Sequence, residues 1–286
     1  NTSTRGSRKE FPAVAVIVAE SGQVTIYDGD DPDLPMWMVF NGGVGTNAII
    51  TGGNGSVGSV SAMNGIVCVG QPAAGSTTRG GIKIIDFFKD RATQHTDKSS
   101  GDGIGYYKGY ITDRNETFGY GTELGVTGRI VNRYVNDVAM TVLPNAPIDY
   151  ATGLPVPTIA VATNGGVSVI KDDGTVVDSA DTDTINSVSF YEGRLLYVKN
   201  NNAGKYADSY SADGFSVTAF SSSGYPAHSG NSITNHGQVW DGHLAYACTS
   251  ANPALNTFAL ESTKEASMVN YITSDYNTGW MNGDIK

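Results

Sequence analysis

The chain of 286 residues has little cysteine, little basic charge and no long apolar run. Its two cysteines, Cys68 and Cys248, are too few for a disulfide framework, and their strand-like apolar surroundings predict buried free thiols. The 18 Lys and Arg stand against 28 Asp and Glu, and the net charge of −10 argues against nucleic acid or an anionic membrane as partner. No apolar stretch approaches the length that spans a bilayer, so no membrane insertion is expected.

Turn and strand formers dominate what is present. Glycine reaches 36 and tyrosine 15, whereas charged residues make up only 16%. This composition is poor in helix formers and predicts an all-β fold. The start, NTSTRGSRKEF, has neither a Met nor the apolar core of a signal peptide, so we expect a processed or excised chain. We interpret residues 1–11 as an N-terminal extension and 12–286 as a single domain.

A hairpin pattern repeats along the chain. Each copy has a strand, a turn of an apolar residue followed by Asn, Glu or Asp and then Gly, and a second apolar strand. The copies are VGSVSAMNGIVCVG (57–70), INSVSFYEGRLLYV (185–198) and TNHGQVWDGHLAYA (234–247). A second pattern, a Gly turn between an apolar strand and an alternating strand, matches VIVAESGQVTIYDGDD (16–31) to IAVATNGGVSVIKDDG (159–174).

Together the two patterns predict a unit of four strands over about 40–50 residues, which is typical of a β-propeller blade. Fuller units begin near Val57, Tyr134, Ile185 and Ile233, and a unit with three strands starts at residue 12. The prediction is a propeller of about five four-stranded blades. An irregular β-sandwich with coincidentally similar hairpins stays open as the alternative.

The C-terminal segment TGWMNGDIK (278–286) repeats the hairpin turn, because Met281-Asn282-Gly283 aligns with Met63-Asn64-Gly65. The pattern therefore predicts that residues 271–281 form the first strand of a blade. The unit at residues 12–40 lacks such a strand. We expect the C-terminal strand to pair with the strand near 13–19 and close the ring, which removes two exposed sheet edges.

No catalytic signature is present: the four histidines form no HExxH or zinc pattern, and there is no Gly-x-Ser-x-Gly elbow. Glycoside hydrolysis needs two facing carboxylates. Asp137, near the start of a first strand, is a candidate, but Ser59, Ser187 and His236 occupy the corresponding positions. An enzyme is therefore not expected.

Two stretches are candidate binding sites. DGDDPD crowds Asp28, Asp30, Asp31 and Asp33, whose carboxylates suit Ca²⁺, although the run lacks the glycine and distal glutamate of an EF-hand. A solvated acidic turn is the alternative. Beyond calcium, no cofactor is expected.

The insertion 103–125 is rich in tyrosine and glycine, and amphipathic aromatics on such a loop suit sugar stacking or a protein interface. An outer hairpin whose aromatics cover the propeller side is the alternative. Its candidate contact residues are Tyr106, Tyr107, Tyr110, Phe118 and Tyr120.

Three segments resemble a class of tailed-bacteriophage tail and tail-fibre proteins: EFPAVAVIVAESGQVTIYDGDDPDLPMWMVF (10–40), SVGSVSAMNGIVCVG (56–70) and YNTGWMNGDIK (276–286). In that class a propeller-like region is often followed by a concanavalin-like lectin module. The resemblance implies a non-enzymatic virion component, folded in the bacterial cytoplasm, that contacts other tail proteins and a host-surface glycan. A secreted bacterial propeller that binds or cleaves carbohydrate, and an intracellular scaffold, stay open as alternatives.

Overall fold

The structure is a computed structural model, and it describes part of the chain. Side chains are described for residues 11–43, 47–50, 57–72, 80–97, 105–121, 128–179 and 183–190, and for Leu195 and Tyr197. Strand backbone is also described at 191, 194–199, 207–211, 214–219, 237–240, 243–248, 254–259 and 269–273. The described residues form antiparallel sheets and one short 3-10 helix, so the all-β prediction is confirmed.

The N-terminal sheet has three antiparallel strands, as its sequence unit predicts. These are β1 (Ala15–Glu20), β2 (Gln23–Asp28) and β3 (Met36–Phe40). Val24 and Ile26 of β2 are fully buried against the next sheet because alternate residues of a strand share one face. Phe11, the last residue of the expected extension, also packs here, with its ring 5.3 Å from that of Trp37.

The second sheet begins with the predicted hairpin. Asn64 and Gly65 both have positive φ, 50° and 71°, as a two-residue turn between twisted strands requires. This sheet has six strands instead of four, because the insertion adds two at its outer edge. The strands are β4 (Ser59–Met63), β5 (Ile66–Gln71), β6 (Gly81–Asp86), β7 (Arg91–His95), β8 (Gly105–Tyr107) and β9 (Tyr120–Gly121).

Two four-stranded sheets and two two-stranded hairpins make up the rest of the described strands. The third sheet contains β10 (Val135–Thr141), β11 (Thr158–Thr163), β12 (Gly166–Ile170) and β13 (Val176–Asp178). Two hairpins follow, β14 (Ile185–Tyr191) with β15 (Arg194–Lys199) and β16 (Ala207–Ser211) with β17 (Gly214–Ala219), and β15 lies beside β16. The last sheet contains β18 (Gly237–Trp240), β19 (His243–Cys248), β20 (Ala254–Ala259) and β21 (Val269–Thr273).

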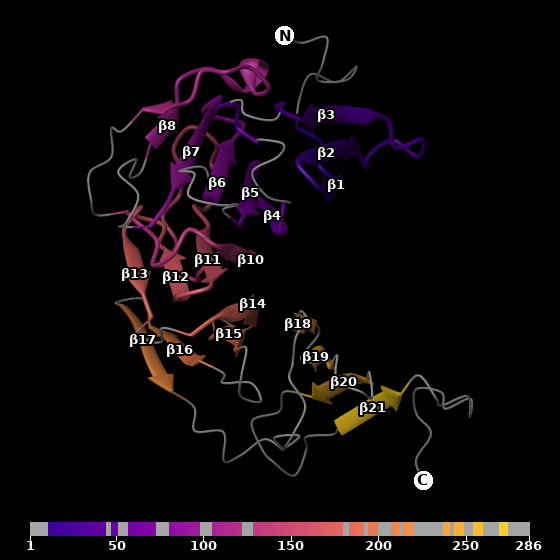
Figure 1. Cartoon of the computed structure of the whole chain (residues 1–286), viewed down its shortest axis with the longest axis vertical. Helices are drawn as coiled ribbons and strands as arrows, with labels where there is room; N and C mark the ends of the chain where they lie inside the picture. Colours follow the sequence, from indigo (N-terminus) through magenta and orange to yellow (C-terminus); the bar gives the residue numbers. More distant parts are fainter. Residues whose placement is uncertain are drawn as a thin grey trace.

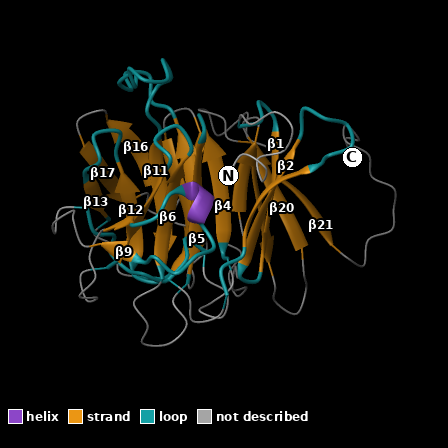
Figure 2. Ribbon diagram, turned by 90° about the horizontal axis from the view of Figure 1, so that it is seen from above, coloured by secondary structure: helices purple, strands orange, loops and turns teal. Residues whose placement is uncertain are grey.

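The sheets follow one another along an arc, in a propeller-like arrangement (Figure 1). Their first strands, β4, β10, β14 and β18, are successive neighbours on the inner side. Seen from above, the strands run between two faces that carry the loops (Figure 2). One apolar core lies between the first and second sheets and another between the second and third. A further core lies between the third sheet and the β14–β15 hairpin. Stability therefore comes from face-to-face packing of neighbouring sheets.

The prediction that residues 271–281 pair with the strand near 13–19 is wrong for residues 271–273. Residues 271–273 belong to β21, which pairs with β20 so that Tyr271 lies opposite Asn256. The physical reason is that Val269–Thr273, rich in strand-forming residues, follows β20 along the chain and covers its otherwise open edge. Residues 274–281 lie outside the described part of the chain.

Two sequence expectations about the chain as a whole can also be compared with the structure. Cys68 is a fully buried free thiol, as predicted, and burial raises the pKa of this thiol well above its usual range. The side chain of Cys248 lies outside the described residues. Within the described segments, no helix is long and apolar enough to cross a membrane.

Candidate functional site

The tyrosine-rich insertion is an outer hairpin in which Tyr107 has a structural position. β8 pairs with β7 on one side and with β9 on the other. Tyr107 is only 4% exposed, and its hydroxyl lies 2.7 Å from the carbonyl oxygens of Asp113 and Glu116, to which it donates. Burial, with the charges of Asp113 and Glu116, raises the pKa of Tyr107 to about 12. This phenol therefore stays protonated and holds the loop closed.

The other four predicted contact residues divide into two pairs. Tyr120 packs against Tyr107, with its ring face 5.1 Å from the buried ammonium of Lys83, and the Arg91 guanidinium lies 4.2 Å over the ring of Tyr106. Tyr110 and Phe118 are 65% and 49% exposed. The insertion thus leaves Tyr110 and Phe118 accessible to a ligand or partner, although the Phe118 ring also packs edge-on against Tyr107 at 6.1 Å.

The acidic run at 28–33 is a turn whose carboxylates accept backbone hydrogen bonds. Asp28 accepts from the amide of Asp30, and Asp31 from that of Asp33, each at 3.0 Å. Asp30 accepts from the amides of Ala13 and Val14 at 2.9 and 3.1 Å, so it fixes the entry into β1. Among the described residues, no three His, Cys, Asp or Glu side chains come together as a metal site. Calcium at this turn stays a prediction.

Asp137 joins the inner strands of three successive sheets. Its Oδ1 accepts a hydrogen bond from the Ser59 hydroxyl of β4 at 2.6 Å, and its Oδ2 accepts from the Val188 amide of β14 at 3.0 Å. The preceding residue, Asn136, sits at a register shift of β10 and donates to the Ile185 carbonyl at 2.8 Å. This side of the arc is therefore held by polar contacts between first strands.

A second exposed surface, which the sequence analysis did not identify, lies on the loop between β10 and β11. Residues 147–156 form a small hairpin, with Ile148 paired to Pro155 in an antiparallel bridge. The amide of Val156 donates to the Pro147 carbonyl at 2.8 Å, and the amide of Asp149 donates to the Leu154 carbonyl at 2.9 Å. The signal that could have found it is PNAPIDYATGLPVP (144–157), where prolines flank one tyrosine on both sides.

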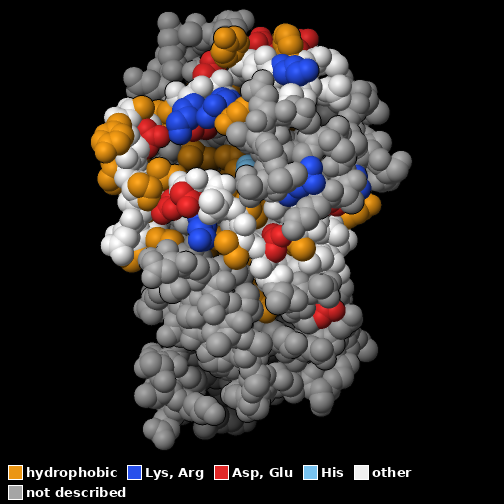
Figure 3. All heavy atoms as spheres, turned by 90° about the vertical axis from the view of Figure 1, so that its left-hand side faces the viewer, with side chains coloured by type: hydrophobic (Ala, Val, Ile, Leu, Met, Phe, Trp, Pro, Cys, Tyr) orange, Lys and Arg blue, Asp and Glu red, His pale blue; other side chains and the backbone are white. Residues whose placement is uncertain are grey.

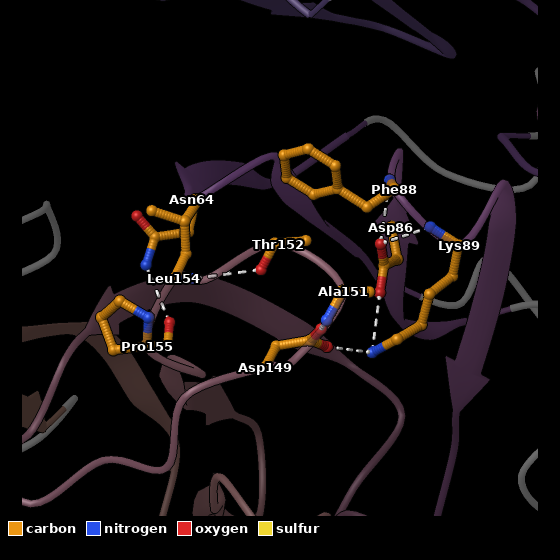
Figure 4. Close-up of polar contacts among 9 residues, drawn as sticks. All are labelled: Asn64, Asp86, Phe88, Lys89, Asp149, Ala151, Thr152, Leu154 and Pro155. Carbon is orange, nitrogen blue, oxygen red and sulfur yellow. Dashed lines mark hydrogen bonds and ion pairs between the residues drawn. The ribbon is translucent and has the colours of Figure 1, made fainter.

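This 147–156 hairpin is anchored to the turns of the second sheet (Figure 4). Lys89, in the β6–β7 turn, lies 3.1 Å from Asp149 of the hairpin and 3.3 Å from Asp86 of its own turn. The Asn64 side chain, in the β4–β5 turn, donates to the Pro155 carbonyl at 2.8 Å. The hairpin is thus tied to two neighbouring turns in addition to its own strands.

The charges of this anchor stabilise one another. The hydrogen bond from Lys89, followed by that from the Ala151 amide, lowers the pKa of Asp149 below 3.8. Burial alone would lower the pKa of Lys89, but the hydrogen bond to Asp149 and the Asp86 carboxylate outweigh it and raise this pKa above 10.5. The Asp149 contribution is therefore lost as the pH falls through its lowered pKa, and the Lys89 contribution as the pH rises through its raised one. Between these limits the anchor is intact.

We expect Asp149→Asn to loosen the hairpin without unfolding the sheets, because the neutral amide no longer attracts Lys89. Hydrogen exchange at pH 7 should be severalfold faster at the amides of Ala151 and Gly153 than in the unsubstituted chain, and this difference should vanish when Asp149 itself becomes protonated. Asp173→Asn is the matched control, since Asp173 accepts from Thr175 within its own turn. Unchanged exchange in Asp149→Asn would show that the anchor does not order the hairpin.

Large apolar side chains stand exposed around the anchor. Tyr150 is fully exposed at 103%, Ile148 and Phe88 are each 53% exposed, and Leu154 is 37% exposed. Phe88 lies against the Asn64–Gly65 turn, where a Cβ on Gly65 would come within 2.2 Å of its ring. We call Phe88, Ile148, Tyr150 and Leu154 the hairpin surface. On another face, the outer side near β8 and β13, the described Lys and Arg side chains are scattered among hydrophobic and acidic ones (Figure 3).

No protein-family model matches the chain, and the search of curated proteins finds no match. Among solved structures, the chain is similar to the computationally designed Ika8 protein, with 9% identity over 88% of this chain and 70% of that one and a TM-score of 0.43. A quinonprotein alcohol dehydrogenase-like protein from Bacteroides thetaiotaomicron is 14% identical over 91% of this chain and 65% of that one, with a TM-score of 0.42. BamB from Moraxella catarrhalis is 13% identical over 66% and 54%, with a TM-score of 0.27. At these identities and TM-scores the similarities assign neither a family nor a function to the chain.

Proposed function

We propose that the chain is a non-enzymatic component of a phage tail, a rigid module for virion assembly with other tail proteins or for contact with a host-surface glycan. The observation that carries the non-enzymatic part is the position of Asp137, the acid named above as a candidate for glycoside chemistry. Its two oxygens accept from Ser59 and Val188 and join strands of neighbouring sheets. A general acid or nucleophile must instead present its carboxyl to the substrate. The phage assignment is supported by the resemblance of residues 10–40, 56–70 and 276–286.

The finer architecture belongs to the same proposal. We infer a five-bladed propeller whose first blade is completed by a C-terminal strand within residues 274–281. Two observations support it. β1 has a sheet neighbour, β2, on only one edge among the described strands, and its Val16 and Val18 are 40% and 38% exposed on the face away from the second sheet. The first and last sheets also lie at the two ends of one arc (Figure 1).

Localisation on the particle tests the function. An antibody against the folded chain, imaged on intact virus by immunogold electron microscopy, is expected to label the tail or its fibres. The matched control is the same antibody after absorption with the purified chain. Labelling confined to the bacterial cell or to its culture medium, with particles unlabelled, would overturn the virion proposal.

The second candidate function is a secreted bacterial propeller that binds or acts on carbohydrate, and the exposure of Tyr110 and Phe118 favours it. A glycan array with the unsubstituted chain and with Tyr110→Ser separates sugar binding from packing, because Tyr110 is 65% exposed whereas Phe118 also packs against Tyr107. Loss of binding in this variant assigns the sugar contact to the insertion. Equal binding by both proteins would remove the insertion from that role.

A further inference from the structure

The hairpin surface combines exposure with order. Tyr150 lies at the tip of a hairpin that is closed by the Ile148–Pro155 bridge and by the Gly153 amide, which donates to the Asp149 carbonyl at 2.8 Å. The Asp149 side chain also accepts from the Ala151 amide at 2.8 Å, so the turn beneath the ring is fixed. A partner would therefore immobilise little more than the tyrosine side chain. Binding to such a preorganised surface avoids most of the entropy cost of ordering a loop.

The polar groups around this surface are already used within the chain. Asp149 accepts from Lys89 and from the Ala151 amide, and the Asn64 amide donates to the Pro155 carbonyl. Asp86 accepts from the amides of Phe88 and Lys89 at 3.1 and 3.0 Å and pairs with the Lys89 ammonium. A sugar site needs polar side chains that bind hydroxyl groups. The surface instead offers an aromatic anchor with three apolar neighbours, which is typical of a protein contact.

The charge of the chain indicates whether the partner is a different protein or a second copy of this chain. The chain carries a net charge of −10, so two copies carry like net charges that disfavour their association. The anchor has two carboxylates, Asp86 and Asp149, for one ammonium, that of Lys89, and so adds no compensating positive charge. Complementarity therefore favours a partner with basic residues around an apolar recess.

We propose that the hairpin surface docks a different protein, which takes Tyr150 into an apolar recess with a basic rim. Ile148, Leu154 and Phe88 cover the edges of the recess and exclude water from the tyrosine, as neighbours of a binding hot spot do. This goes beyond the proposed function, because it names a face and a class of partner whether or not the chain belongs to a virion.

The test uses a displayed library of random peptides, selected on the full chain and then measured individually by fluorescence polarisation. Peptides that combine apolar with Lys or Arg residues should be enriched. Their affinity should fall at least about 30-fold on Tyr150→Ser, which corresponds to a hot-spot side chain, and less than about twofold on Tyr110→Ser. Tyr110 is the matched control, since it is an exposed tyrosine on the other loop. Both variants should keep the melting temperature of the chain, because neither ring is buried.

Three results would overturn the proposal. The first is a set of selected peptides that bind Tyr150→Ser as tightly as the unsubstituted chain. The second is sedimentation showing a self-associated chain that Tyr150→Ser converts to monomer, which would make a second copy the partner. The third is glycan-array binding that Tyr150→Ser abolishes, which would make the site a sugar site. A negative localisation on virus particles leaves all three measurements unaffected, so the two proposals fail separately.

Discussion

Asp137→Ala is expected to lower the free energy of unfolding by about 3 kcal/mol, measured by urea denaturation at pH 7. The substitution removes charge-assisted hydrogen bonds from Ser59 and Val188 and leaves these partly buried donors without that acceptor. Since these bonds connect β10 to β4 and to β14, the loss falls on contacts between sheets. We expect the midpoint to move while the slope with urea stays constant, because the exposed surface on unfolding is unchanged.

Asp178→Ala is the matched control for this substitution. Asp178 also accepts from a serine hydroxyl, that of Ser168 at 2.7 Å, but the pair lies within the third sheet. Its removal should cost about 1 kcal/mol, the usual net contribution of a hydrogen bond. A catalytic acid behaves in the opposite way, because active-site groups are held at a cost to stability and their removal is commonly neutral or stabilising. Equal or higher stability of Asp137→Ala would therefore favour the glycoside-acting alternative.

The sequence predicts the repeating hairpins well because they depend on local chemistry. Asn64 and Gly65 accept the positive φ angles of a tight turn, and the continuous apolar run of β5 that follows is buried on both faces, as in a central strand. The same local pattern misplaces residues 271–273. Their strand character is correct, but they pair with the preceding strand, where Asn256 lies opposite Tyr271, and not with the distant strand near 13–19.

The candidate sites are harder to predict, because they depend on which polar groups meet in space. Composition identifies the tyrosines of the insertion, yet only the folded chain shows that the Tyr107 hydroxyl closes the loop while Tyr110 faces solvent. The prolines of residues 144–157 mark the loop of the hairpin surface, but they do not show which elements it contacts. This surface arises because Lys89, 60 residues before Asp149, reaches across from another sheet. Such long-range ion pairs leave no periodic signal.

Removal of residues 274–286 is expected to lower the melting temperature by about 10 °C and to promote aggregation, because the edge of β1 would stay unpaired. The loss should be visible by circular dichroism at low protein concentration. The matched control is a chain that lacks residues 1–10 and begins at residue 11. It should melt within about 2 °C of the full chain. An unchanged melting temperature after the C-terminal truncation would mean that β1 gains nothing from this segment.

The pairing of the C-terminal segment with β1 can be tested at single residues. In the β4–β5 hairpin, Met63 lies opposite Ile66. Aligning Met281 with Met63, and β1 with β5, places Met281 opposite Ala15 and Thr278 opposite Val18. Two residues directly opposite each other across antiparallel strands have Cβ atoms about 4.5–5.5 Å apart, which lets a pair of cysteines meet after a small adjustment.

The most direct measurement is therefore disulfide formation in the double variant Val18→Cys/Thr278→Cys under mild oxidation, followed by peptide mass spectrometry. A closed ring predicts an intramolecular disulfide between residues 18 and 278, together with a higher melting temperature than that of the reduced protein. Met36→Cys/Thr278→Cys, with the first cysteine on β3 of the same sheet, should stay reduced. A disulfide in the Met36 variant, and none in the Val18 variant, would contradict closure of the ring at β1.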